Sequence, residues 1–368
     1  ASSAASTSGS KATAASDAGT LQGAELGRAT TIGGVGTIGG QVDFGGSAAA
    51  TNVTGNAQAT GELSTLAQGL STTSATSGTF GTDVSSDATV QGFANLNTSA
   101  DASTTAGEAD ADAKGASIDG AQLGDLSIGG VGTVTGSANF AAAANAANVT
   151  GGGSDAADAK AEVNSVDGLD LLANSNGLSV SSDAGIQGLA SIDLAATAAS
   201  TGALDAKTQA LATASADELQ GAELNSLTDI GGVGSIAGQV SLGSAADAAN
   251  VTGKAQGIGT LRTAEGLDLN DNLEVASDAN VSGSATIGST ADAATTNGKA
   301  IAKSTSDIIT GADLSEGLVD IGGIGSIAGQ ANFDLSASSS NVEGKSNAVS
   351  SADTSTGLIG KETTNPEG

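Results

Sequence analysis

The stretch "DIGGVGSIAGQVSL" (229–242) decides the fold, because its words occur three more times in the chain. The other copies are "TIGGVGTIGGQVDF" (31–44), "SIGGVGTVTGSANF" (127–140) and "DIGGIGSIAGQANF" (320–333). A glycine loop that holds a phosphate or a calcium ion is normally needed once. Four copies instead indicate a building block of a repeat protein.

Each copy begins a block of constant length. The isoleucines of the IGG words are unevenly spaced, yet an Asn always follows at the same distance: Ile32 and Asn52, Ile128 and Asn148, Ile230 and Asn250, Ile321 and Asn341. The block is therefore one rigid unit, and the length changes lie in loops elsewhere. Insertions at fixed places are typical of stacked repeats.

Inside each block, apolar and polar residues alternate with a period of two, which predicts a half-buried strand. We expect strands at 37–44, 133–140, 235–242 and 326–333, and strands of the same template midway between them at 89–96, 185–192 and 280–287. The predicted core positions are Ile38, Gly40, Phe44, Val134, Gly136, Phe140, Ile236, Gly238, Leu242, Ile327, Gly329 and Phe333. A shorter strand precedes each IGG word, at 21–26, 118–123, 219–224 and 309–314.

The glycine on the apolar face of each long strand predicts close packing. Glycine weakens a strand unless another backbone approaches it, and alanines at alternate places after these strands would permit close stacking. The predicted fold is all-β: internal repeats of about 96 residues form a β-solenoid or a stacked thin β-sandwich, with edges completed by a neighbouring subunit.

The phase of the repeat predicts the domain organisation. We expect an N-terminal arm (1–20), three repeats (21–117, 118–218 and 219–307), an incomplete fourth repeat (308–350) and a C-terminal tail (351–368). The segment 11–26 matches the closing part of an internal repeat, so Ala12, Ala14 and Leu21 are candidates for an arm that completes the sheet of the next subunit. Such an exchange would give an open polymer.

Composition narrows the partners. The chain has 40 Asp and Glu against 11 Lys and Arg, a net charge of −29, and it would repel nucleic acid and anionic membranes. No window reaches the roughly 18 consecutive apolar residues of a membrane span. A disordered chain would share the charge and the small residues, but 38% hydrophobic content in strict spacing, with a single Pro, favours a folded protein.

The chemistry of known glycine motifs does not fit. The calcium-binding repeat GGxGxDxUx requires an Asp where this chain has Thr37, Thr133, Ser235 and Ser326, and it recurs at a much shorter period. A P-loop would need a following Lys-Ser/Thr and a helix. The chain contains no His and no Cys, which excludes the usual nucleophilic triads and the usual zinc ligands. We therefore expect no enzyme and no cofactor.

Two recurring polar features keep alternatives open. The pairs Ser86-Asp87, Ser182-Asp183 and Ser277-Asp278 precede the midway strands, and each Asp is expected to bind its own following backbone in a turn; a ladder of calcium ligands is the alternative. Asn52, Asn148 and Asn250 stand in N-x-T sequons, which fit a structural turn, with glycosylation as the alternative.

The repeat and the Ala/Gly/Ser/Thr/Asp-rich, Cys-free composition over about residues 11–350 resemble those of bacterial secreted β-rich proteins that form extracellular fibres, matrix or surface layers. The resemblance implies export and self-association. The small-residue start "ASSAASTSGS" also fits a mature exported protein. The expected function is a structural subunit that assembles head to tail with itself; the alternative is a monomeric repeat module of an adhesin that binds sugar, ice or another surface.

Overall fold

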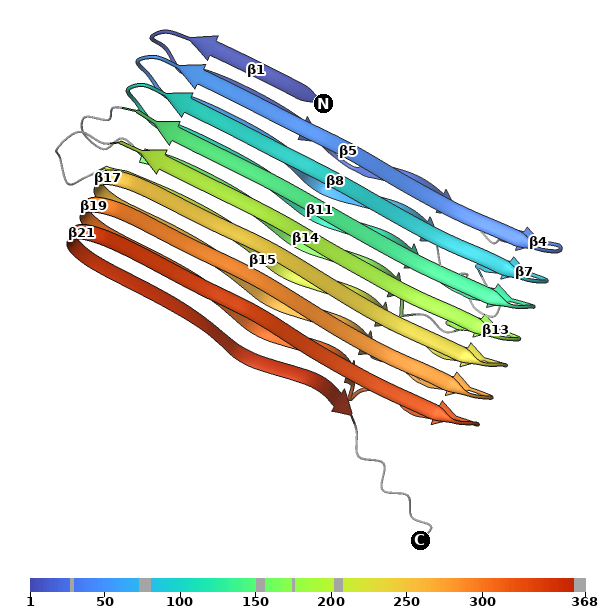
Figure 1. The fold of residues 1–368 in the computed structure, drawn as a ribbon. Coiled ribbons are helices and arrows are strands. Elements are labelled where there is room, and N and C mark those ends of the chain that lie inside the picture. Colours follow the sequence, from blue (N-terminus) through green and yellow to red (C-terminus); the bar gives the residue numbers. More distant parts are fainter. Residues whose placement is uncertain (27–29, 73–80, 150–155, 174–175, 202–207, 361–368) are drawn as a thin grey trace.

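The structure is a computed structural model that describes residues 1–26, 30–72, 81–149, 156–173, 176–201 and 208–360. All regular elements in these ranges are strands, and every pairing between them is parallel. The chain winds as a parallel β-helix whose coils stack from the N-terminal end to the C-terminal end (Figure 1). The described part contains no helix long and apolar enough to span a membrane.

Each coil has two long walls joined by a short apical strand. Wall 1 consists of β5, β8, β11, β14 and the first halves of β17, β19 and β21; wall 2 consists of β6, β9, β12, β15 and the second halves of the same three strands. The bounds are β1 Ser2–Thr7, β2 Ala12–Ala18, β3 Leu21–Leu26, β4 Thr30–Ile32, β5 Gly36–Asn52, β6 Ala57–Thr72, β7 Thr82–Val84, β8 Ala88–Thr104, β9 Ala109–Leu123, β10 Leu126–Ile128, β11 Gly132–Asn148, β12 Ala156–Leu171, β13 Leu178–Val180, β14 Ala184–Ser200, β15 Gln209–Leu224, β16 Thr228–Ile230, β17 Gly234–Leu269, β18 Leu273–Val275, β19 Ala279–Leu314, β20 Val319–Ile321 and β21 Gly325–Gly360.

Wall 1 keeps a strict register along the stack. Gly36 pairs with Ala88, Ala88 with Gly132, and the same column continues through residues 184, 234, 279 and 325. One coil therefore runs from Gly36 to Ala88, and the next, which is shorter, from Ala88 to Gly132. In the interior strands of this wall, buried and solvent-facing residues alternate.

The long repeat read from the sequence is two coils. The IGG strands and the midway strands pair side by side in one wall, as Val134 of β11 does with Val90 of β8 and Ile186 of β14. The short strands predicted before the IGG words are the ends of wall-2 strands in alternate coils, where Ala121 of β9 pairs with Leu70 and Leu169. One coil, about half of the predicted repeat, is thus the structural unit.

Two rows of glycine bring the walls into backbone contact. One row lies in wall 1 and the other faces it from wall 2: Gly40, Gly92, Gly136, Gly188, Gly238, Gly283 and Gly329 against Gly69, Gly120, Gly168, Gly221, Gly266, Gly311 and Gly357. A Cβ built on Gly238 would lie 2.6 Å from the carbonyl carbon of Gly266 and would overlap its oxygen. We call this line of contact the glycine waist.

The waist separates two hydrophobic cores. On one side, rows of alanine such as Ala100, Ala144 and Ala196 fill a thin blade. On the other, larger aliphatic side chains such as Ile128, Leu169 and Leu178 fill the space between both walls and the apical strands β4, β7, β10, β13, β16, β18 and β20. A chain with only five Phe residues reaches a dry interior because alanine rows let the two walls of the blade lie close together.

The predicted fold class is wrong beyond its all-strand content. The molecule is a parallel β-helix and not a β-sandwich, and its unit is one coil, such as that from Gly36 to Ala88, rather than the predicted two-coil repeat. The predicted completion of an edge by a donated arm also fails, since residues 2–7 pair with β5 and residues 12–18 with β6 of the same chain. Ala12 and Ala14 are buried there, and Leu21 packs partly buried against the alanine core.

Candidate functional site

The last three of the four GGVG-type words form turns that receive an Asp from the preceding coil. The Oδ1 atom of Asp87 accepts a hydrogen bond from the backbone N–H of Val131 at 2.8 Å. Asp183 does the same for Val233 at 2.8 Å, and Asp278 for Ile324 at 2.7 Å. A Cβ on the second glycine of the word would collide with that carboxylate. The Ser-Asp pairs therefore stabilise the neighbouring coil, whereas the sequence predicted a bond to their own turn.

A buried Asn fixes the opposite turn in alternate coils. Asn250 donates hydrogen bonds from Nδ2 to the carbonyl oxygens of Thr208 at 3.2 Å and Lys254 at 3.1 Å. Asn52 and Asn148 are equally buried, with 2% exposure each, and donate to backbone carbonyls. The amide nitrogens of the three sequon Asn residues bind the backbone of these turns. A glycan on any of these nitrogens would have to break those hydrogen bonds, so the sequons have a structural role.

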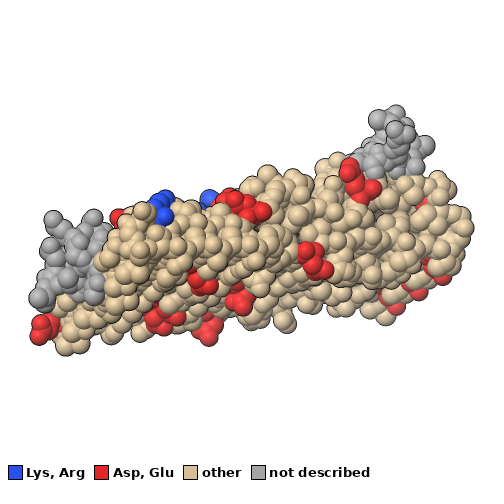
Figure 2. Space-filling view, turned by 90° about the horizontal axis from the view of Figure 1, so that it is seen from above, with Lys and Arg blue, Asp and Glu red and all other residues tan. Residues whose placement is uncertain are grey.

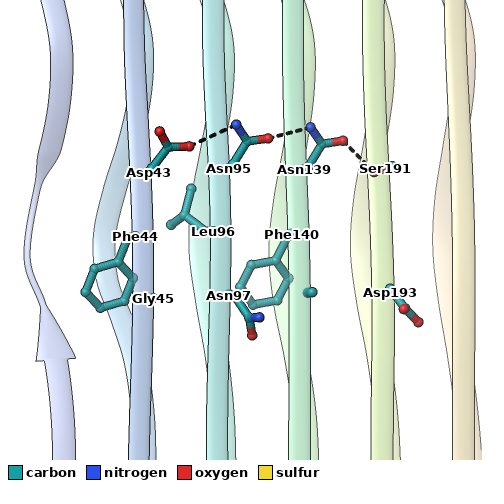
Figure 3. A pocket seen from close by; sticks show the side chains of 11 residues that line it. Asp43, Phe44, Gly45, Asn95, Leu96, Asn97, Asn139, Phe140, Ser191 and Asp193 are labelled. Carbon is teal, nitrogen blue, oxygen red and sulfur yellow. Dashed lines mark hydrogen bonds between the residues drawn. The ribbon is translucent and has the colours of Figure 1, made fainter. Parts of the chain in front are cut away.

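The outer face of wall 1 carries a polar ladder. Asn95 donates to Asp43 at 3.0 Å, Asn139 donates to Asn95 at 2.7 Å, and Ser191 donates to Asn139 at 2.6 Å (Figure 3). Beside the ladder, the small residues Gly45 and Ala141 leave a shallow hollow of about 430 Å³. This surface offers amide, carboxylate and hydroxyl groups in a row across successive coils.

Wall 2 carries two parallel rows that consist mostly of carboxyl groups, which we call the acidic seam. The first row runs Asp119, Asp167, Gln220 and Glu265; the second runs Asp170, Glu223, Asp268 and Asp313. Amide side chains bind the second row: Gln122 donates to Asp170 at 3.1 Å, and Asn270 donates to Asp268 at 3.0 Å. In the first row, Asp119 is 7% exposed and accepts from Ser117 at 3.1 Å.

Burial makes these carboxyl groups weak acids. Desolvation raises the pKa of Asp119 to about 6 and that of Glu223 to about 7. Desolvation also raises the pKa of Asp167 to about 8, with further increases from the negative charges of Asp119, Glu218, Glu223 and Asp170. At neutral pH the carboxyl group of Asp167 therefore keeps its proton for most of the time, because burial disfavours its charged form.

The structure gives no geometric support to the calcium alternative. Within the described ranges, no group of three or more Asp or Glu side chains is placed to hold a metal ion. The Asp residues that were alternative calcium ligands accept backbone hydrogen bonds instead.

The last described coil exposes the core positions of its strand. Ile327 and Phe333 are 42% and 51% exposed, although Ile236 and Phe140 at the same columns are 0% and 2% exposed. The other predicted core side chains face inward: Ile38, Val134, Ile236 and Leu242 are buried, and Phe44 is partly buried. Gly40, Gly136, Gly238 and Gly329 lie in the glycine waist.

The acidic seam was missed from the sequence. Its signal is the pair of related words "GLDL" and "GAEL", which alternate over three successive coils at 168–171, 221–224 and 266–269. Of the two words, only "GAEL" is predicted as part of a strand from the sequence. That the carboxyl groups of successive coils lie side by side is therefore not predicted.

Comparison with protein-family models, with curated proteins and with solved structures finds no match. The function is therefore argued from the geometry of this chain.

Proposed function

We propose that this protein is a secreted structural subunit that stacks end to end with copies of itself into a fibre or a surface layer. The observation that carries the proposal is the exposed last coil. Ile327 and Phe333 stand at columns that are buried in interior coils, where a following coil covers them. The contact is coil on coil, without exchange of an arm.

The strand edge supports the same contact. Among the described strands, β21 pairs only with β19, so the backbone groups on the other side of residues 325–360 have no strand partner. Such an edge is a template for another strand. The opposite end of the stack, seen along its axis in Figure 2, is long and narrow and mostly neither acidic nor basic.

The alternation of coils also continues across the junction. The wall-1 column that contains Asn52 holds Asn and Thr or Ser in turn, and the last coil has Asn341 there. The first coil carries Thr7 at this column. A second copy that places its first coil on β21 therefore keeps the two-coil pattern unbroken.

A single substitution at the exposed end tests this function. Phe333→Glu would put a charge between stacked coils, and we expect the full chain to lose filaments in negative-stain electron microscopy while its circular dichroism stays that of a β-protein. Asn332→Glu adds the same charge at the preceding position on the outer face and should leave filaments intact. Filaments of normal length with Phe333→Glu, or none with the unaltered chain, would refute the proposal.

The second candidate is a binding module, favoured by the polar ladder of Figure 3. A flat row of amide and carboxylate groups suits a hydroxyl-rich surface such as a polysaccharide. Asn95→Ala with Asn139→Ala should abolish pull-down on insoluble polysaccharide without changing filaments. Unchanged pull-down would eliminate this candidate.

A further inference from the structure

The turn between wall 1 and wall 2 bears a row of exposed branched side chains. Valine and threonine alternate along seven coils: Val53, Thr105, Val149, Thr201, Val251, Thr296 and Val342. The four valines are 49%, 54%, 46% and 77% exposed. Because the Asn beside each valine already fixes the turn, these valines have no role in the core. We call this row the valine ridge.

A groove runs beside the ridge on the outer face of wall 1. Over the last five coils its floor is Ala147, Ala199, Ala249, Ala294 and Ser340, and the hollow measures about 500 Å³. Its far side is formed by Thr197, Asp247 and Asp292. The ridge and the groove thus lie side by side, one next to the other along each strand.

This surface is complementary to itself. If two copies face each other with their stacks parallel, a two-fold axis along the row of turns places the ridge of each copy over the groove of the other. In each of the last five coils the ridge residue then meets a small residue: Val149 meets Ala147, Thr201 meets Ala199, and Val251 meets Ala249 of the other copy. The coil spacing matches because both copies have the same repeat.

The charges fit the same arrangement. Lys254 and Lys299 follow the turn in the coils that carry Asp247 and Asp292 on the far side of the groove. In the paired copies, Lys254 of one copy would lie on the same side as Asp247 of the other, and Lys299 on the same side as Asp292. Neither lysine makes an ion pair within the described part of the chain, which has few such pairs.

The area is sufficient for a specific contact. Seven coils at about 4.8 Å and six residue steps at about 3.3 Å give a face of about 700 Å² per copy. The two faces together bury about 1,400 Å², within the range of about 1,200–2,000 Å² for stable interfaces.

We propose that two copies of this chain pair side by side, in parallel and in register, with the valine ridge of each in the alanine-floored groove of the other. This contact is separate from the end-to-end stacking and does not depend on it. It makes the unit of a fibre or layer a double rod.

Sedimentation of chains that cannot stack end to end measures the side-by-side contact alone. With Phe333→Glu present in every sample, the chain is expected to sediment as a two-chain species at micromolar concentration. Ala199→Gln with Ala249→Gln fills the groove from the solvent side and should weaken pairing at least tenfold. Thr37→Gln with Thr133→Gln, which point outward elsewhere on wall 1, should not. A single-chain species throughout, or pairing that ignores the groove, would overturn the proposal.

Charge reversal tests the arrangement directly. Asp247→Lys and Lys254→Asp should each weaken pairing, and the chain with both changes should recover it. The chain has no Cys, so introduced thiols are unambiguous. Ala249→Cys mixed with Val251→Cys should form disulfide-linked pairs faster than Ala249→Cys mixed with Val342→Cys, whose thiols would lie two coils apart. Equal rates, or a double charge reversal that stays unpaired, would contradict the register.

Discussion

Replacement of Gly238 by alanine tests whether the glycine waist holds the walls together. The new Cβ would lie 2.6 Å from the carbonyl carbon of Gly266 and 2.9 Å from the Cα of Leu267. Both atoms belong to the backbone of wall 2, so no side chain can rotate away. The two walls would have to separate locally, against the register of the coils above and below.

The expected cost follows from overpacking. Extra methylene groups in a packed core typically cost about 1–3 kcal/mol, and we place Gly238→Ala at about 3 kcal/mol because only backbone can yield. Gly238→Val should cost more. Gly243→Ala in the same strand is the matched control, since its Cβ would meet only Asp193 Oδ1 at 3.4 Å and Ile192 O at 3.9 Å. Loss of backbone freedom in the unfolded chain should make the control neutral or stabilising by up to about 1 kcal/mol.

Urea unfolding followed by circular dichroism measures the difference, and native-state hydrogen exchange locates it. The amides of β17 around residue 238 and of its partner strands β14 and β19 should exchange faster in Gly238→Ala, while those of β5 stay protected, because a repeat stack unfolds locally. Equal unfolding midpoints for Gly238→Ala and Gly243→Ala would show that the walls are not in contact, and the two-core description would then be wrong.

The remaining predictions concern polar groups. Because the folded chain raises the pKa of Asp167 to about 8, it binds a proton that the unfolded chain releases near pH 4; the associated stability is complete below about pH 4 and is lost as pH rises to about 8. The urea concentration at the unfolding midpoint should therefore decrease as the pH is raised from 5 to 9. Asp167→Asn should flatten that pH dependence, whereas Asp193→Asn on the exposed face of wall 1 should not. An unchanged slope in Asp167→Asn would refute the assignment. Asp183→Ala removes the acceptor of the Val233 N–H and should destabilise the chain by about 1 kcal/mol, with faster exchange at the Val233 amide and no change at Val131, which Asp87 serves. Equal protection of both amides would contradict this role. Asn250→Leu removes the side-chain donor to the carbonyls of Thr208 and Lys254, of which the first keeps the backbone N–H of Lys254. The change should cost about 1–3 kcal/mol in thermal or urea unfolding, and a neutral result would show that water replaces the amide.

The strands and their inward faces were readable because they depend on short-range pattern. Alternation of apolar residues along a strand is a local signal, and the glycine at position 238 indicated a close neighbour before that neighbour was known. The neighbour, Gly266, belongs to the wall-2 half of β17 and opens the word "GLDL", which does not by itself indicate the strand that it faces. Periodicity within one segment cannot say which segment packs on it.

The length of the coil was misread for a chemical reason. Successive coils differ at their turns, with Gly-Gly-Val in one and Ser-Ser-Asp in the next, so the most similar words are two coils apart. The prediction of an arm that completes the sheet of the next subunit followed from that error. With a repeat of two coils, each end of the chain holds half a repeat and would therefore lack strands. In the structure, residues 1–18 supply strands β1 and β2 of a first coil, paired to β5 and β6.

The alternation of Gly-Gly-Val and Ser-Ser-Asp turns, which made one coil look like half a repeat, also makes the two ends of the stack different. The Gly-Gly turns at 129–131, 231–233 and 322–324 bind the carboxylate of the coil before them, as the Val233 N–H does with Asp183. Neighbouring coils are therefore complementary rather than identical. A stack built this way has two different ends. It therefore suits end-to-end growth in one orientation, while the valine ridge and the groove, which lie side by side on one face of the stack, suit a symmetric contact between two such rods. The proposed growth along the axis and the proposed pairing across it would use different residues, Phe333 for the first and Val251 with Asp247 for the second, and substitutions can therefore separate them.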